Sequence, residues 1–269
     1  MTTNTDTFAL GIAYQGTRYH GWQYQGESTP TIQLAVQAAL NVVADEPVQV
    51  TCAGRTDTGV HATKQVVHLN TTKQRSEKAW VMGTNAHLPD DISVVWARSV
   101  ASDFNARHSA VARRYCYVVY TSPIRSALFS GMYTRDPRRI DAEAMHEAGQ
   151  ALLGEHDFSS FRASSCQSNT AMRNVHHIKV TRRGEMIVID IEANAFLHHM
   201  VRNIAGVLLD IGAGVRSATW TAELLTLADR TKGSVTAPPH GLYLVDVIYP
   251  GEPQIPAGPA LPHFMQGLL

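Results

Sequence analysis

The chain has 269 residues, of which 44% are hydrophobic and 17% are charged, and its formal net charge is zero. This composition excludes a disordered protein, and the neutral balance argues against binding of nucleic acid through net charge alone. Three widely spaced cysteines form neither a disulfide framework nor a zinc-ligand pattern, which indicates a reducing, cytoplasmic environment. The sequence shows no signal-like start and no long apolar run, so no association with a membrane is expected.

The first half predicts alternating strands and helices. Residues 8–14 read as a strand, Thr29 and Pro30 begin a helix that reaches about Ala44, and residues 48–52 read as a second strand. A polar turn leads to a third strand at 63–69. A helix at 76–86 and a strand at 92–98 complete the order β-α-β-β-α-β, the split pattern of a ferredoxin-like unit.

The second half predicts the same order with an extra helix. Its expected elements are a strand at 113–120, a helix from 141 to about 153, a hairpin at 175–181 and 185–191, helices at 196–211 and 221–228, and a strand at 243–249. The predicted fold class is therefore α+β, with two ferredoxin-like halves, antiparallel sheets and helices packed on one side. The domains are expected at residues 1–106 and 107–269, with an extended Pro- and Gly-rich tail after residue 250.

The polar turn from Ala53 to Ala62 is the first candidate site. Asp57 lies at its centre, Arg55 stands two residues earlier, and a glycine flanks each side. A reactive carboxylate needs such a loop, because the backbone can bend and a nearby cation keeps the acid ionised. Asp-Thr-Gly is equally an ordinary turn sequence, since Asp caps its own backbone and Gly accepts positive φ.

Two features of the second half could complete such a site. Arg202 lies in a nearly all-apolar stretch of the helix expected at 196–211, so it either pairs with Asp57, pairs with Asp210 or extends to solvent. Tyr115 follows two arginines on a strand, where it could stack on a base or fill the core. Seven arginines and one acid between residues 104 and 139 suggest an anion-binding segment.

Other chemistry finds little support. In the pairs His176-His177 and His198-His199, adjacent side chains diverge on a strand or helix, so neither pair is expected to chelate a metal. No GxGxxG opens a helix and no phosphate-binding loop is present in the sequence.

Five segments together resemble the tRNA pseudouridine synthase I (TruA) family. The most specific is Gly54-Arg55-Thr56-Asp57-Thr58-Gly59-Val60-His61-Ala62; the others are residues 19–23, residues 104–107 together with 112–115, residues 196–203 and residues 241–244, so the resemblance spans nearly the whole chain. It implies conversion of uridine to pseudouridine at positions 38 to 40 in the anticodon stem-loop of tRNA. It also implies a cleft between the two halves, a homodimer, and neither cofactor nor metal.

The resemblance also implies a role for individual residues. Asp57 is expected to be the catalytic carboxylate and Arg202 its basic partner. Tyr115 is expected to pack on the target base and help to move a proton, Arg55 to act within the same loop, and Leu242 to line the base pocket. Two other readings remain open: an RNA-binding module in which Asp57 is only a turn residue, and a metal-dependent nuclease, which would need clustered carboxylates.

Overall fold

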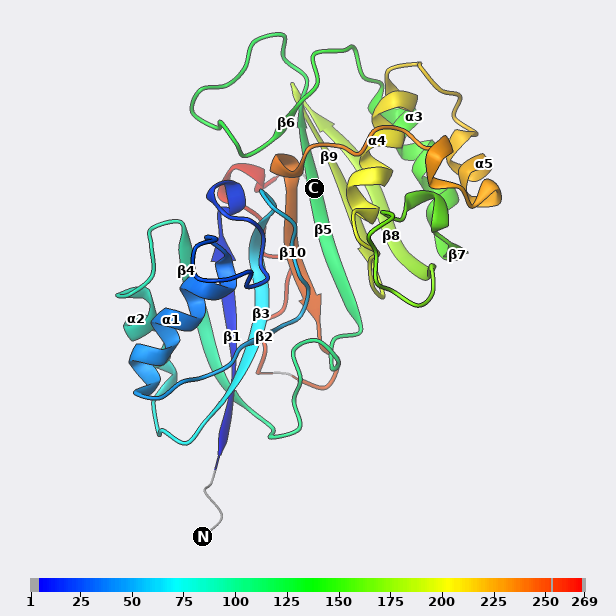
Figure 1. The fold of residues 1–269 in the computed structure, drawn as a ribbon. Helices are drawn as coiled ribbons and strands as arrows, with labels where there is room; N and C mark the ends of the chain where they lie inside the picture. The colour runs from blue at the N-terminus through cyan, green and yellow to red at the C-terminus, as the bar shows by residue number, and fades with distance from the viewer. Residues whose placement is uncertain (1–4, 253, 268–269) are drawn as a thin grey trace. The chain divides into compact units, whose positions relative to one another are not determined.

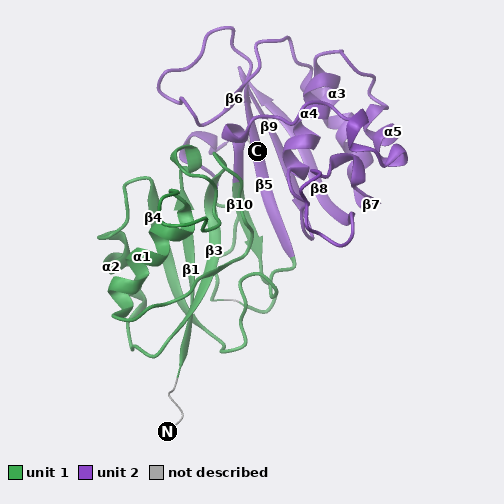
Figure 2. Ribbon diagram, in the orientation of Figure 1, with its two compact units in different colours: residues 1–111, 244–260 green, residues 112–243, 261–269 purple. Residues whose placement is uncertain are grey.

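The chain forms two compact units, shown in separate colours in Figure 2. The computed structural model describes residues 5–252 and 254–267. Unit 1 comprises residues 1–111 and 244–260, and unit 2 comprises residues 112–243 and 261–269. The sequence predicts a single boundary at 106/107, whereas residues 244–260 return to the first unit. A return over such a distance in sequence leaves no local signal in composition.

Unit 1 is an antiparallel sheet with two helices on one side (Figure 1). Strands β4 (Ile92–Val100), β1 (Asp6–Tyr14) and β3 (His61–Thr71) lie side by side, and the short β2 (Thr51–Cys52) pairs with β3. Residues 244–248 of β10 (Leu242–Ile248) adjoin β3. Helices α1 (Ile32–Ala44) and α2 (Glu77–Asn85) pack on each other, and Trp80 of α2 contacts Phe8 with ring centroids 5.5 Å apart.

Unit 2 repeats the mixed α+β construction with different elements. Its strand order is β5 (Ala112–Tyr120), β9 (Met186–Ala193), β8 (Met172–Arg183) and β7 (Gly154–Asp157), and β6 (Thr134–Arg135) pairs with β5. Helices α3 (Ala142–Gly149), α4 (Met200–Gly212) and α5 (Trp220–Leu227) gather on one side of this sheet in Figure 1. Strands β6 and β7 were not predicted.

Three predicted boundaries were wrong for identifiable reasons. Helix α1 begins at Ile32 rather than Pro30, because the Thr31 hydroxyl caps the amide of Leu34 at 3.3 Å. Only Thr51 and Cys52 of the strand expected at 48–52 pair with β3. Helix α4 begins at Met200 rather than at residue 196, since the backbone of His199 is left-handed (φ 62°) and cannot continue a helix on its N-terminal side.

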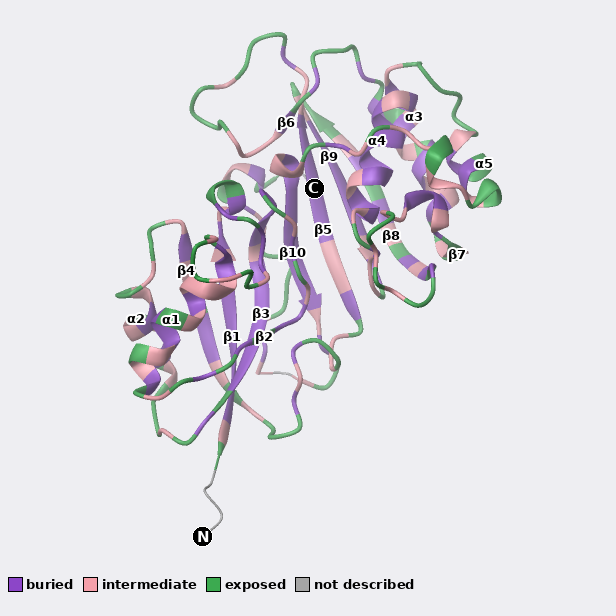
Figure 3. Ribbon diagram, in the orientation of Figure 1, coloured by how far each residue is buried: buried purple, intermediate pink, exposed green. Residues whose placement is uncertain are grey.

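Burial follows the sheets and the helix faces turned toward them (Figure 3). The tail is less extended than expected, because it includes a short 3-10 turn at His263–Met265 and buries Ile255 and Met265; residues 253, 268 and 269 lie outside the described part. Within the described residues, no helix combines the length and apolarity that a bilayer span requires.

Candidate active site

The turn that carries Asp57 is tightly defined. The Asp57 carbonyl accepts a hydrogen bond from the amide of Val60 at 3.1 Å, and Gly59 between them has a φ of 78°. Positive φ at the third position is the signature of a type II turn, which requires glycine there. Asp57 is half-buried and Arg55 is exposed. Burial raises the pKa of the Cys52 thiol to about 12, and the charge of Arg55 partly opposes that shift.

The Asp57 turn lies against residues 15–26, the segment after β1 that contains Gly16, Gly21 and Gly26 and is called the glycine-rich segment below. The amide of Trp22 donates to the Thr56 carbonyl at 2.9 Å, and the amide of Gly59 donates to the Tyr19 carbonyl at 3.4 Å. Between these contacts, Gly21 has a φ of 85°, and a Cβ on it would approach the Thr56 carbonyl oxygen to 2.6 Å. Only glycine fits this position, so two motifs that are distant in sequence form one local structure.

A buried polar network beneath the turn was missed by the sequence analysis. The Gln65 side chain exchanges two hydrogen bonds with the backbone of Gly54, and its amide also donates to the Tyr14 hydroxyl at 3.4 Å. Tyr14 in turn bonds Thr56 Oγ1 at 2.8 Å. Gln65 is fully buried and Tyr14 nearly so. The sequence carries little signal for this burial, because two other polar residues directly precede Gln65.

His61, the last polar residue of the motif, supports the same segment. Its ring is 1% exposed, and its Nδ1 accepts a hydrogen bond from the amide of Gly16 at 3.0 Å. An accepting Nδ1 carries no proton, so the neutral ring is protonated on Nε2. His61 thus holds the start of the glycine-rich segment beside the turn.

Arg202 extends from α4 in unit 2 toward the segment before β10. The residue is half-buried, its Nε donates to the Ala237 carbonyl at 2.8 Å, and the Ala237 amide donates back to the Arg202 carbonyl at 3.1 Å. Asp210, the partner considered from sequence, forms its ion pair with Arg138 at 2.9 Å. The structure therefore gives no support to an Arg202–Asp210 pair.

Tyr115 lies on β5 and is 8% exposed. Its ring packs edge-to-face on Phe196, with centroids 5.1 Å apart, and Phe196 reaches it from the irregular segment before α4. Such a contact contributes about 0.5–1.5 kcal/mol beyond area burial. Most of the ring is therefore occupied by protein contacts, as the core interpretation expected.

Unit 2 brings Arg202, β5 and Leu242 to the same segment, residues 237–242. The Tyr117 hydroxyl contacts Thr134 Oγ1 at 2.6 Å and donates to the Pro238 carbonyl at 2.8 Å. Burial raises the pKa of Tyr117, while the positive charge of Arg202 acts in the opposite direction. Leu242 follows at the start of β10 and is 6% exposed.

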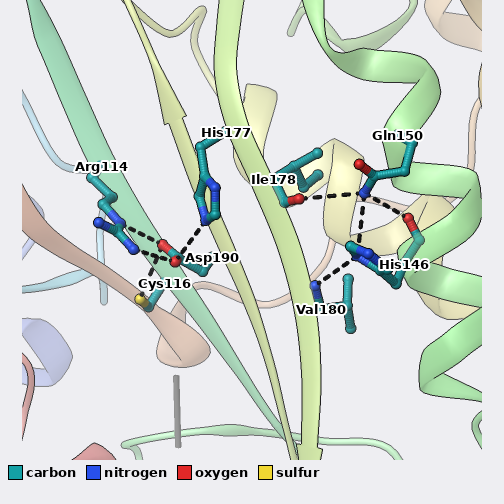
Figure 4. Close-up of polar contacts among 8 residues, drawn as sticks. All are labelled: Arg114, Cys116, His146, Gln150, His177, Ile178, Val180 and Asp190. Carbon is teal, nitrogen blue, oxygen red and sulfur yellow. Dashed lines mark hydrogen bonds and ion pairs between the residues drawn. The ribbon is translucent and has the colours of Figure 1, made fainter.

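Arg114 does not offer its charge to a ligand. Figure 4 shows its guanidinium directed at Asp190, with Nε–Oδ1 at 2.8 Å and Nη2–Oδ2 at 2.5 Å, while His177 Nε2 approaches the same carboxylate at 3.0 Å. The Asp190 side chain is 2% exposed, so the charges compensate each other within the protein. His176 also contacts an acidic residue of β9, Glu192. A bulge in β8 between Val175 and His177 turns the side chains of His176 and His177 to one face of the sheet. The expectation that these two side chains diverge was therefore wrong.

The arginine-rich segment instead presents charge at a hollow on unit 2. About 430 Å³ in volume, the hollow is lined by Thr121, Pro137, Arg138, Arg139, Ile140 and Arg182. Arg138 is compensated by Asp136 and Asp210, whereas Arg182 is fixed by bonds to the carbonyls of Ile140 and Gly184 at 2.7 and 3.1 Å. Arg138, Arg139 and Arg182 are all exposed on this surface, and Arg138 is the one that pairs with two carboxylates.

Asp57 and Arg55 thus lie in unit 1, and Tyr115, Arg202 and Leu242 lie in unit 2. Each unit positions its own residues through the contacts described above. The pairing of Asp57 with Arg202 joins the two units and stays a prediction.

Comparison with known proteins agrees with the motifs. The family model described as tRNA pseudouridine synthase matches residues 11–109 and 148–250. The tRNA pseudouridine synthase A of Pseudomonas aeruginosa is 55% identical over 260 residues, covering 97% of this chain and 91% of that protein. The enzymes of the same name from Histophilus somni and Haemophilus influenzae are 55% and 54% identical, each covering 96–97% of this chain and 95–97% of theirs.

Proposed function

The chain belongs to the tRNA pseudouridine synthase family and is an isomerase, and from this premise we propose that it converts uridine to pseudouridine at positions 38 to 40 in the anticodon stem-loop of tRNA. The observation that carries the proposal is the Asp57 turn. It lies inside the family match, it is half-buried rather than fully solvated, and backbone bonds on both sides define its conformation.

The proposed reaction fits the residue types. The N1–C1′ bond of the uridine breaks, the uracil turns, and C5 bonds to C1′, with one proton lost from C5 and one gained at N1. Neither oxidation nor hydrolysis occurs, so the chemistry needs no cofactor. An ionised Asp57 would act as nucleophile or as a base toward the sugar. Arg202 is proposed as its counter-ion, and a cation beside a carboxylate favours the charged form.

The target uridine lies in or beside a paired stem, so the enzyme is expected to swing it out of the stack. Tyr115 is proposed to contact the extruded base, with Leu242 forming the wall of the pocket. Stacking on an aromatic ring contributes about 1–3 kcal/mol per base. Because Tyr115 is 8% exposed, we place its contribution at the lower end of that range.

The finer architecture belongs to the same proposal. Unit 1 has the antiparallel pairing β4–β1–β3 with β2 on β3, which is the arrangement expected of a ferredoxin-like half. We extend that architecture to both halves, with the active site in a cleft between them, and place the enzyme in the cytoplasm as a homodimer. Arg139 and Arg182 are proposed to hold backbone phosphates, which position tRNA without reading its sequence.

The deciding experiment replaces Asp57 by Asn, which keeps the size of the side chain and removes its charge. With an unmodified tRNA transcript, pseudouridine formation at positions 38 to 40 should fall by roughly 10³-fold or more, while tRNA affinity changes little. The matched control is Asp45→Asn, because Asp45 is an exposed carboxylate on unit 1 and should leave turnover unchanged.

Three outcomes would count against the proposal. Retained activity in Asp57→Asn would show that Asp57 is only a turn residue, as the RNA-binding-module reading expects. Strand cleavage abolished by a chelator would favour the metal-dependent nuclease. Unchanged turnover in Arg202→Met would place the counter-ion of Asp57 elsewhere.

A further inference from the structure

We infer that Gln65 and Tyr14 form a positioning clamp for Asp57, and that turnover depends on this clamp beyond its contribution to stability. The inference rests on the proposed role of Asp57 and assigns the supporting residues of that site. Both residues lie in strands, Tyr14 at the end of β1 and Gln65 in β3, and their side chains meet beneath the turn.

Hydrogen-bond chemistry fixes the direction of the bonds that Gln65 makes. The Gln65 amide nitrogen only donates, and its two protons go to the Gly54 carbonyl at 2.5 Å and the Tyr14 hydroxyl at 3.4 Å. The Tyr14 hydroxyl also shares a hydrogen bond with Thr56 Oγ1 at 2.8 Å, in which either oxygen can donate. Gln65 Oε1 accepts from the Gly54 amide at 3.3 Å. Gln65 therefore bonds both to the backbone of the turn and to the tyrosine that contacts Thr56.

The clamp holds the turn on the N-terminal side of the acid. Gln65 holds Gly54, which lies three residues before Asp57. Tyr14 holds Thr56, which immediately precedes Asp57. The Thr56 carbonyl is held separately by the amide of Trp22 at 2.9 Å. A displacement of about 1 Å in a reacting group costs on the order of 10²-fold in rate, so small movements here should be visible in turnover.

A competing account is that this network only stabilises the fold, as satisfied buried polar groups generally do. The chain offers a matched control for that account. The Asn85 side chain also makes two hydrogen bonds to one backbone residue: it donates to the Val94 carbonyl at 2.9 Å and accepts from the Val94 amide at 2.7 Å. It lies in the same unit, at the end of α2, and none of its described bonds involves the Asp57 turn.

The test compares Gln65→Met, Tyr14→Phe and Asn85→Leu in the full-length protein, measuring kcat and KM for a tRNA transcript together with the melting temperature. Gln65→Met should lower kcat about 10- to 100-fold with KM changed less than about threefold, and Tyr14→Phe about 3- to 10-fold. Asn85→Leu should lower the melting temperature comparably and leave kcat unchanged.

The inference is overturned if Gln65→Met and Tyr14→Phe keep the wild-type kcat at temperatures where they are folded, or if Asn85→Leu lowers kcat equally. Should Gln65→Met not fold, Tyr14→Phe decides, since it removes a single hydroxyl. Asp57→Asn is measured in parallel. If it is inactive while both clamp variants turn over normally, the clamp alone fails; if it is active, the proposed function fails.

Discussion

The buried ion pair between Lys64 and Asp246 gives the sharpest stability prediction. Lys64 follows the Asp57 turn on β3 and Asp246 lies on β10, and their side chains are 4% and 9% exposed. Lys64→Met keeps the length of the side chain but leaves a buried carboxylate without its cation. Breaking a buried pair in this way costs about 3–5 kcal/mol. We therefore expect Lys64→Met to lower the free energy of unfolding by about 3–5 kcal/mol at pH 7.

The assay is urea unfolding followed by tryptophan fluorescence in a Trp220→Phe background, since the other three tryptophans, Trp22, Trp80 and Trp96, all lie in unit 1. Lys73→Met is the control, because the Lys73–Asp45 pair is 37% and 80% exposed and should contribute less than about 1 kcal/mol. The double variant Lys64→Met/Asp246→Leu should cost at least about 3 kcal/mol less than the sum of its single variants. A Lys64→Met penalty as small as that of Lys73→Met would refute the reasoning.

Two further predictions concern pH and salt. Burial lowers the pKa of His68, whose Nδ1 accepts a hydrogen bond from the Ala106 amide at 3.1 Å. Below about pH 6.5 the unfolded state therefore binds a proton that the folded state does not, and the free energy of unfolding should fall by up to about 1.4 kcal/mol per pH unit. His68→Asn, measured by the same fluorescence assay, should abolish this pH dependence; if the dependence persists, another group is responsible. Replacing Arg139 and Arg182 by Gln should weaken tRNA binding and reduce the slope of log affinity against log salt concentration by about one to two. The control Arg75→Gln, on unit 1, should leave both the affinity and the slope unchanged. An unchanged slope for the Arg139 and Arg182 variants in filter binding would place the phosphate contacts elsewhere.

The sequence predicted most elements, because their signals are local. The apolar runs of strands β1 and β3, the alternation of β5 and the capping residues Ser76 and Asp141 identified their elements correctly. The predicted start of α4 was wrong because Phe196 and Leu197 extend the apolar pattern of the helix toward its N-terminus. Tertiary contacts override that pattern: Phe196 packs on Tyr115 instead, and the left-handed His199 ends the irregular segment.

The site was predictable only in its exposed, motif-bearing part. Asp57 stands in a segment whose composition identifies it as a turn. The residues that hold the turn contact partners distant in sequence: the Tyr14–Thr56 bond joins residues 42 positions apart, and the Gln65–Tyr14 bond joins residues 51 positions apart. Gln65 lies in a polar stretch of its strand, so its burial gives no signal in the sequence. Its partner depends on strand pairing, because the register of β1 on β3 places Gln65 near the end of β1.

Strand β3 joins the candidate site to the far end of the chain. The adjacent side chains of Lys64 and Gln65 point to opposite faces of the strand, so Gln65 reaches the turn while Lys64 reaches Asp246. Thr63 adds a bond to the Leu244 carbonyl at 3.4 Å. A fragment ending near residue 106 would lack these partners, including the carboxylate that pairs with Lys64. The half proposed from sequence to carry Asp57 is therefore not a contiguous folding unit, because Lys64 pairs with a residue 182 positions further along the chain.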